Sequence, residues 1–197
     1  RQSQGTALML QVYTGNGKGK TTAAIGLAIR SLGAGHRVYM MQFMKSLAYA
    51  EQHILKDLAN MMLETTGKPF FIAEEGMVDE KTRLAFGDDL VVFPHGQPPH
   101  DYLAMMVDGM EHVTELLRKQ VFDLVILDEI NVALSFGLIQ REQMEALLDL
   151  VPVETEVVCT GRNAPSWLQD RADLITNMEE VRHYYRHGVD ARKGIEN

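Results

Sequence analysis

The fold is decided by a stretch rich in glycine and lysine, Val12-Tyr13-Thr14-Gly15-Asn16-Gly17-Lys18-Gly19-Lys20-Thr21-Thr22. A mostly apolar run at 7–13 precedes the turn and predicts a buried parallel strand. A helical pattern follows from Thr21 to Leu32, with Gly33 as its stop signal. Glycines between strand and helix let consecutive N–H groups point at phosphate oxygens, and the helix N-terminus adds its positive dipole end. The stretch therefore predicts a phosphate-binding loop.

The polar side chains of this loop fit the same chemistry. The standard pattern is G-x-x-x-x-G-K-[ST], and here Thr14 stands where the first glycine would be. We expect Lys20 to reach the outer phosphates and the Thr21 hydroxyl to complete a Mg²⁺ shell. The alternative is a glycine-rich turn that caps a helix without any ligand. The strand before it, the helix after it and the second lysine, Lys18, disfavour that alternative.

The rest of the chain alternates between strand and helix patterns. Further strands are predicted at 38–43, 123–129, 156–160 and 174–178, with a short apolar run at 61–64. Helices are predicted at 47–59, from Asp101 (the candidate N-cap), at 141–150 and after Pro165. Such alternation implies an α/β fold, with a mostly parallel sheet and helices on both faces. We expect one domain over 1–197.

Two carboxylates end the predicted strand at 123–129. Parallel strands present their carboxyl ends to one crevice, so Asp128 and Glu129 fit the acid that faces the metal in a phosphate-loop enzyme. The alternative is structural, a helix N-cap followed by an acid in the first turn. A phosphate loop at the same edge of the sheet weakens that alternative.

Composition excludes several function classes. The chain has 197 residues, 46% hydrophobic, and its 19 Lys and Arg against 27 Asp and Glu give a net charge of −8, which disfavours nucleic-acid binding. The single Cys159 excludes an intrachain disulfide and a Cys-rich zinc site, and it fits a reducing compartment. No uncharged apolar run approaches the roughly 18 residues of a membrane span. Because residues 1–5 lack a signal core and an initiator Met, we expect a trimmed, cytoplasmic chain.

Six motifs in order resemble one family. After the loop come Gln42-Phe43-Met44-Lys45, Leu127-Asp128-Glu129-Ile130-Asn131 and Thr160-Gly161-Arg162-Asn163-Ala164-Pro165. The chain closes with Ala172-Asp173-Leu174-Ile175-Thr176-Asn177-Met178 and Gly188-Val189-Asp190-Ala191-Arg192-Lys193-Gly194-Ile195-Glu196. Together they resemble the ATP:corrinoid adenosyltransferases, which include cobyrinic acid a,c-diamide adenosyltransferase.

The resemblance implies a RecA-like P-loop fold, a homodimer and transfer of the 5′-deoxyadenosyl group of ATP to the Co(I) of a reduced corrinoid, with release of triphosphate. A flavoprotein is the implied reductant. Carried over by position, the residues that would hold the nucleotide are Gly15, Asn16, Gly17, Lys18, Gly19, Lys20, Thr21, Thr22 and Arg162. Thr21, Asp128 and Glu129 would serve Mg²⁺. Lys18 and Lys20 would stabilise the departing triphosphate.

Two departures lie on the expected corrinoid side. Where the family has a Gly-Phe-Thr-Trp-like segment, this chain has Gly67-Lys68-Pro69-Phe70-Phe71-Ile72, so Phe70 matches and Ile72 replaces the Trp. Residues 76–100 are predicted to be an insertion. One hypothesis makes Phe93, with Val91 and Val92, a lid that excludes water from the corrinoid; the alternative is a surface hairpin that packs only on its own domain.

Two other functions stay open at this point. One is a different P-loop NTPase or small-molecule kinase, if only the loop and Asp128-Glu129 count. The other is a nucleotide- or corrinoid-binding protein that has lost the transfer.

Overall fold

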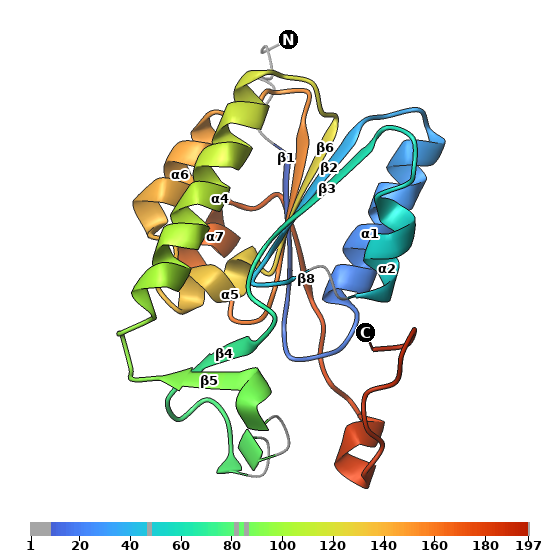
Figure 1. Cartoon of the computed structure of the whole chain (residues 1–197). Helices are drawn as coiled ribbons and strands as arrows, with labels where there is room; N and C mark the ends of the chain where they lie inside the picture. Colours follow the sequence, from blue (N-terminus) through green and yellow to red (C-terminus); the bar gives the residue numbers. More distant parts are fainter. Residues whose placement is uncertain (1–8, 47–48, 81–82, 85–86, 197) are drawn as a thin grey trace.

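The apolar runs form a six-stranded sheet in a computed structural model that describes residues 9–46, 49–80, 83–84 and 87–196 (Figure 1). Its order is β3-β2-β6-β7-β1-β8, and every neighbouring pair is parallel. The strands are β1 (Met9–Thr14), β2 (Val38–Phe43), β3 (Met61–Thr66), β6 (Leu124–Asp128), β7 (Glu156–Thr160) and β8 (Leu174–Asn177). Every residue of β2 and β6 is buried, as expected for central strands covered on both faces. The predicted α/β class is confirmed.

Helices cover both faces of this sheet. Helices α1 (Lys20–Gly33) and α2 (Ala50–Leu55) lie on one face, and α4 (His100–Arg118), α5 (Ile130–Ser135), α6 (Arg141–Asp149) and α7 (Ser166–Arg171) lie on the other (Figure 1). The apolar stripe of α4, which includes Met106, Met110 and Val113, is buried in the larger of the two cores. Strand β7 lies between β6 and β1, which is the RecA-like arrangement.

Two helix boundaries differ from the predictions. Helix α2 is shorter than 47–59, because the chain turns after Leu55 and Asn60 adopts φ +63° before β3 begins; its predicted start at Leu47 lies outside the described residues. Asp101 is not the N-cap of α4. Pro99 occupies that position, and its carbonyl accepts from the Leu103 N–H at 3.0 Å. Asp101 instead lies in the first turn of the helix, where an acid also suits the dipole, and it pairs with Lys68.

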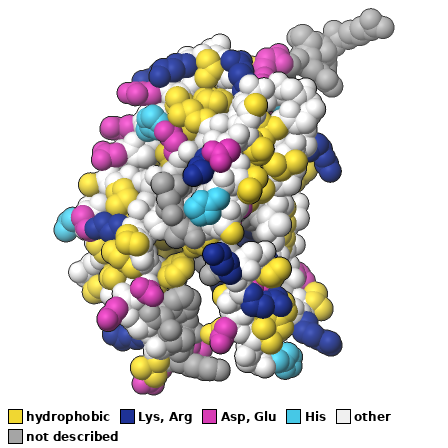
Figure 2. Space-filling view, turned by 45° about the vertical axis from the view of Figure 1, so that its right-hand side comes forward, with side chains coloured by type: hydrophobic (Ala, Val, Ile, Leu, Met, Phe, Trp, Pro, Cys, Tyr) yellow, Lys and Arg dark blue, Asp and Glu magenta, His cyan; other side chains and the backbone are white. Residues whose placement is uncertain are grey.

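A second, two-stranded sheet lies beyond the carboxyl ends of the main strands (Figure 1). It pairs β4 (Phe71–Glu74) with β5 (Leu90–Phe93), which follows a short 3₁₀ turn at Gly87–Asp89. The pair is parallel, so the segment between the strands crosses over, and the hairpin topology of the second hypothesis for 76–100 is wrong. The chain's last part, with a 3₁₀ turn at Tyr184–His187, extends from the same edge of the domain, and the two parts appear as separate lobes in Figure 2.

Charged side chains of both signs are interspersed on the face that Figure 2 shows. Among the residues that the structure describes, no helix is long and apolar enough to cross a membrane.

Candidate nucleotide site

The glycine-rich loop connects the end of β1 to the start of α1 and owes its path to two left-handed glycines. Gly15 has φ +96° and Gly19 has φ +113°, a region that other residues rarely adopt. Gly19 is also the N-cap of α1, and no side chain caps the first N–H groups there. These N–H groups have no capping side chain, and an anion is the natural partner of such a helix N-terminus.

The loop is held close to the segment that follows β8. The Gly17 N–H donates to the Met178 carbonyl at 2.6 Å. A Cβ at Gly17 would lie 2.8 Å from the Met178 carbonyl oxygen and from the Glu179 carbonyl carbon. Only glycine fits between these backbones without moving one of them. In this arrangement the Gly17 N–H is therefore bonded to the Met178 carbonyl and is not available to a phosphate oxygen.

The two loop lysines are placed differently. Lys20 Nζ donates to the carbonyls of Gly15 at 2.8 Å and Gly17 at 2.7 Å, so it already lies across the concavity. Burial lowers the pKa of Lys20, the nearby charge of Arg162 lowers it further, and Glu129 opposes both. Lys18 points to the C-terminal lobe, where its Nζ donates to the Ile195 carbonyl at 3.1 Å.

Thr14, the departure from the standard pattern, has a structural partner. Its buried hydroxyl accepts from the Ala164 N–H at 3.2 Å and so links the end of β1 to the loop after β7. Asn131 makes a second link, because its side-chain N–H₂ donates to the Tyr13 carbonyl at 3.2 Å and to the Gly161 carbonyl at 3.0 Å. These bonds hold Arg162, which is exposed, near the glycine-rich loop.

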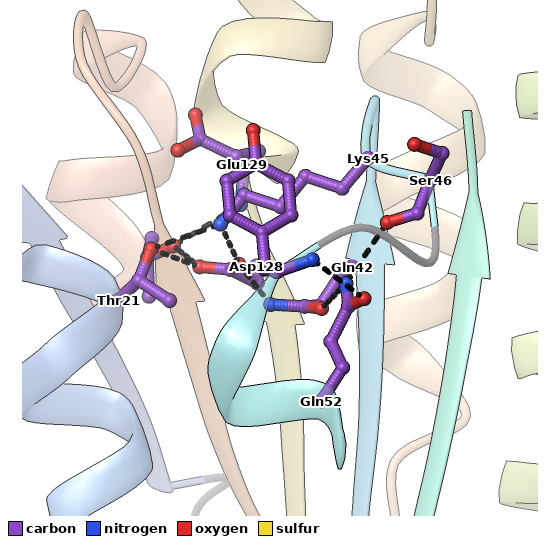
Figure 3. A network of polar contacts seen from close by, with 9 residues as sticks. Thr21, Gln42, Lys45, Ser46, Gln52, Asp128 and Glu129 are labelled. Carbon is purple, nitrogen blue, oxygen red and sulfur yellow. Dashed lines mark hydrogen bonds and ion pairs between the residues drawn. The ribbon is translucent and has the colours of Figure 1, made fainter. Parts of the chain in front are cut away.

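Asp128 is the centre of the polar network in Figure 3. Its side chain is fully buried, and every oxygen has two donors. Oδ1 accepts from the hydroxyls of Thr21 at 2.8 Å and Thr160 at 2.6 Å. Oδ2 accepts from Gln42 Nε2 at 3.1 Å and from Lys45 Nζ at 2.7 Å. The predicted meeting of the loop threonine with the acid at the end of β6 is present in this geometry.

Lys45, Gln42 and Thr160 were not assigned a role from the sequence. Gln42 belongs to β2 and Lys45 follows it, while Thr160 ends β7. Both strands pair with β6, so their carboxyl ends necessarily meet at Asp128. The signal that could have found them is a polar residue at the end of an otherwise apolar strand.

Glu129 follows Asp128 in the left-handed region, with φ +61°, as the N-cap residue of α5. Its side chain makes no capping hydrogen bond. A purely structural role as a helix cap therefore accounts for the position of this residue in the chain but not for its carboxylate. Burial and the neighbouring charge of Asp128 raise the pKa of Glu129, while Lys45, Lys20 and Arg162 oppose the rise. The loop lysine, the two acids and Arg162 therefore share one electrostatic environment.

Asn16, in the loop, and Thr22, in the first turn of α1, are both exposed.

The residues expected on the corrinoid side lie apart from this network. Phe70 is half-buried and its ring centroid lies 6.3 Å from that of Tyr102. Ile72 and Phe93 are buried in the larger core, with 8% and 3% of their surface exposed. The Phe93 ring meets Phe136 edge to face at 5.7 Å. Phe93 thus packs on its own domain, as the second hypothesis for this segment predicted, although the segment is not a hairpin.

The oxygen donors at the end of β6 suit a hard cation. Mg²⁺ takes one or two carboxylates and completes its shell with water and substrate phosphates. Thr21 with Asp128 and Glu129 offers that set beside the phosphate loop. Among the described residues there is no cluster of three or more His, Cys, Asp or Glu that could hold a metal ion without such help. The donor set therefore fits Mg²⁺ with water, and nucleotide phosphates once they are bound, as its remaining ligands.

The chain's sequence is similar to known proteins over almost its whole length. The family model described as ATP:corrinoid adenosyltransferase BtuR/CobO/CobP matches residues 6–197. A corrinoid adenosyltransferase of a Sinorhizobium species is 32% identical over 190 residues, covering 95% of this chain and 79% of that protein. One from Pseudomonas aeruginosa is 30% identical, covering 95% and 83%, and CobA of Salmonella typhimurium is 29% identical, covering 99% and 88%.

Among solved structures, the flagellar accessory protein FlaH of Methanocaldococcus jannaschii is similar to 85% of this chain and 69% of its own, at 13% identity and a TM-score of 0.46.

Proposed function

The chain belongs to the ATP:corrinoid adenosyltransferase family, and we propose that it transfers the 5′-deoxyadenosyl group of ATP to the Co(I) of a reduced corrinoid and releases triphosphate. The observation that carries this proposal is the family match over 6–197, which includes both the loop and the closing motif. An unrelated P-loop NTPase or kinase has no reason to carry that closing motif, so this alternative is not favoured.

In this reaction the protein has to position the substrates and supply charge, and it does not have to supply a nucleophile. Co(I) attacks C5′ of ATP, the C5′–O bond breaks, and its electron pair leaves with the triphosphate. Cobalt is the nucleophile, which agrees with a site built of lysines, hydroxyls and carboxylates, and with Cys159 being fully buried. No acid is needed for the leaving group, because triphosphate leaves as an anion.

In this proposal the loop of 15–22 and Arg162 bind the triphosphate. Lys20 and Lys18 exchange their present carbonyl partners for phosphate oxygens, a gain because a phosphate acceptor is itself charged and a carbonyl is neutral. Thr21, Glu129 and Asp128 hold Mg²⁺, which when bound neutralises negative charge on the leaving group. The contact between Thr21 and Asp128 supports this assignment.

For the corrinoid, we propose an approach from the lobe that carries β4 and β5. The half-buried Phe70 is the contact residue there, with Ile72 and Phe93 packed beneath it in the core. Residues 76–100 are then an insertion in a chain that otherwise acts as one domain over 1–197. The support is their position beyond the carboxyl ends of the main strands, beside the phosphate loop's edge of the sheet (Figure 1).

We also propose a homodimer in the cytoplasm that receives electrons from a flavoprotein. The dimer is supported by the edge strand β8, all of whose residues are exposed, including Leu174 and Ile175. Light scattering after size exclusion tests the dimer.

The test of the activity is anaerobic incubation with ATP, Mg²⁺ and chemically reduced cobalamin, followed by the visible spectrum and by phosphate analysis. We expect an adenosylated corrinoid and triphosphate in equal amounts, with little ADP. ADP and phosphate as the main products, formed without corrinoid, would instead identify an NTPase. Binding of both substrates without adenosylation would identify a protein that has lost the transfer.

A further inference from the structure

The ammonium group of Lys45 contacts two of the side chains that the proposed function assigns to Mg²⁺. Lys45 Nζ is 2.7 Å from Asp128 Oδ2 and 3.4 Å from Thr21 Oγ1 (Figure 3). Its side chain is only 11% exposed. The ammonium thus bonds both to the loop hydroxyl and to the strand-end carboxylate, the pair of oxygens that fits a Mg²⁺ ion.

The backbone around Lys45 directs the side chain to this position. Met44 adopts φ +60°, which is uncommon for a residue other than glycine and marks a sharp change of chain direction after β2. Gly67 packs so closely that no side chain fits between it and the backbone of Met44 and Lys45. The backbone at Met44 and Gly67 therefore fixes where the Lys45 side chain begins.

A chain of buried amides joins the same carboxylate to the segment that carries Lys45. Gln42 Nε2 donates to Asp128, and Gln42 Oε1 accepts from Gln52 Nε2 at 2.6 Å. Gln52 Nε2 also donates to the Ser46 carbonyl at 3.0 Å, and its Oε1 accepts from the Tyr49 N–H at 3.2 Å. With Gln42 and Gln52 holding the segment in place, Lys45 can change partner by rotating its own side chain.

We propose that Lys45 is a further triphosphate-binding residue, which occupies the cation position until a divalent cation displaces it. Asp128 Oδ2 and Thr21 Oγ1 cannot hold an ammonium group and a dication together, because like charges about 4 Å apart repel strongly even at a moderate dielectric constant. The displaced ammonium stays on a short tether beside the loop, where the nucleotide phosphates bring new negative charge. This inference rests on the proposed function, since it takes triphosphate as the leaving group.

The competing interpretation is a permanent ion pair in which Lys45 only stabilises the fold. The two interpretations predict different changes in cation affinity when Lys45 loses its charge. If Lys45 competes with the cation, then removing its charge strengthens cation binding and weakens triphosphate binding. If Lys45 is purely structural, its removal leaves Asp128 uncompensated and loosens the site, so that both affinities fall or neither changes.

The experiment compares Lys45→Met with Lys56→Met, a control at the exposed end of α2. Calorimetry measures Mn²⁺ binding to the nucleotide-free protein, then triphosphate binding at saturating Mn²⁺. For Lys45→Met we expect Mn²⁺ to bind at least about tenfold more tightly, since a like charge is gone. We expect triphosphate to bind about tenfold more weakly, since a charged contact is lost. Lys56→Met should change neither, and an unchanged or weaker Mn²⁺ affinity in Lys45→Met overturns the proposal.

A second measurement uses the wild-type protein, in case Lys45→Met does not fold. Acetylation of Lys45 by a dilute reagent is followed by peptide mass spectrometry, with Lys56 as the internal reference. Labelling of Lys45 should rise several-fold when Mg²⁺ is added and fall again when triphosphate follows. Labelling that does not respond to Mg²⁺ overturns the exchange. Neither measurement involves a corrinoid. A protein that fails to adenosylate a corrinoid can therefore still show the exchange of Lys45 with the cation, and a protein that adenosylates can fail to show it.

Discussion

Replacing Asp128 by Asn removes the negative charge that compensates Lys45 while keeping the shape of the side chain. Both groups are taken from water, with Asp128 fully buried and Lys45 11% exposed. Breaking a buried ion pair from one side costs about 3–5 kcal/mol, because the remaining charge is uncompensated. The threonine hydroxyls can reorient to accept from the new amide N–H₂ group. The Lys45 ammonium group can only donate, and its positive charge is left without a negative partner. The cost is therefore expected to come mostly from Lys45.

For a chain of this length, that loss corresponds to a fall in Tm of roughly 6–20 °C. Urea unfolding followed by the fluorescence of Trp167, the single tryptophan, measures it directly. The matched control is Asp149→Asn, which removes the exposed ion pair with Arg171 and should cost less than about 1 kcal/mol.

A double variant separates the charge from the hydrogen bonds. Adding Lys45→Met to Asp128→Asn removes the uncompensated ammonium, so the double variant should regain at least half of the lost stability. A cost below about 1 kcal/mol for Asp128→Asn alone would refute the reasoning. So would a double variant no more stable than the single one, because the cost would then come from the threonine and glutamine contacts.

Lys20→Ala should lower the adenosylation rate by at least about two orders of magnitude in steady-state assays, since one preorganised charge at the leaving group is lost; near-wild-type turnover would contradict the assigned site. Glu129→Gln should weaken the response of turnover to Mg²⁺. Because burial and Asp128 raise the pKa of Glu129 above its ordinary value of 4.5, the folded state takes up a proton before the unfolded state does. The wild type should therefore gain unfolding free energy relative to Glu129→Gln as the pH falls toward 4.5, and parallel pH profiles would contradict this. Gly17→Ala should weaken ATP binding in titrations, because the new Cβ forces the backbone at 178–179 to move. The control is Gly26→Ala, which is exposed on α1 with open space around it. This variant should bind ATP normally and gain about 0.5–1 kcal/mol of stability in urea unfolding. Burial raises the pKa of Cys159, so its alkylation should follow global unfolding, and fast labelling of the native protein would count against the described core.

Local patterns were enough for most strands of the main sheet and for helices α1, α4, α6 and α7, but they did not predict β4, β5 or α5. The apolar run that ends at Asp128 is buried throughout, and the loop lies between β1 and α1 as its glycines predict. The boundary errors were also local in origin. Helix α2 stops early because the chain must turn at Asn60, and Pro99 takes the capping position expected of Asp101.

What the sequence determined by itself was therefore most of the main sheet's strands and helices, the glycine-rich loop and the acid at the end of β6, since all of these follow from residues close together in the chain. Only the tertiary structure decided which distant side chains meet. Lys45 and Asp128 are 83 positions apart and touch because β2 pairs with β6. Phe93 is buried because Phe136, on another element, packs against it. Strand order and burial depend on how every element packs at once, so no local pattern contains them.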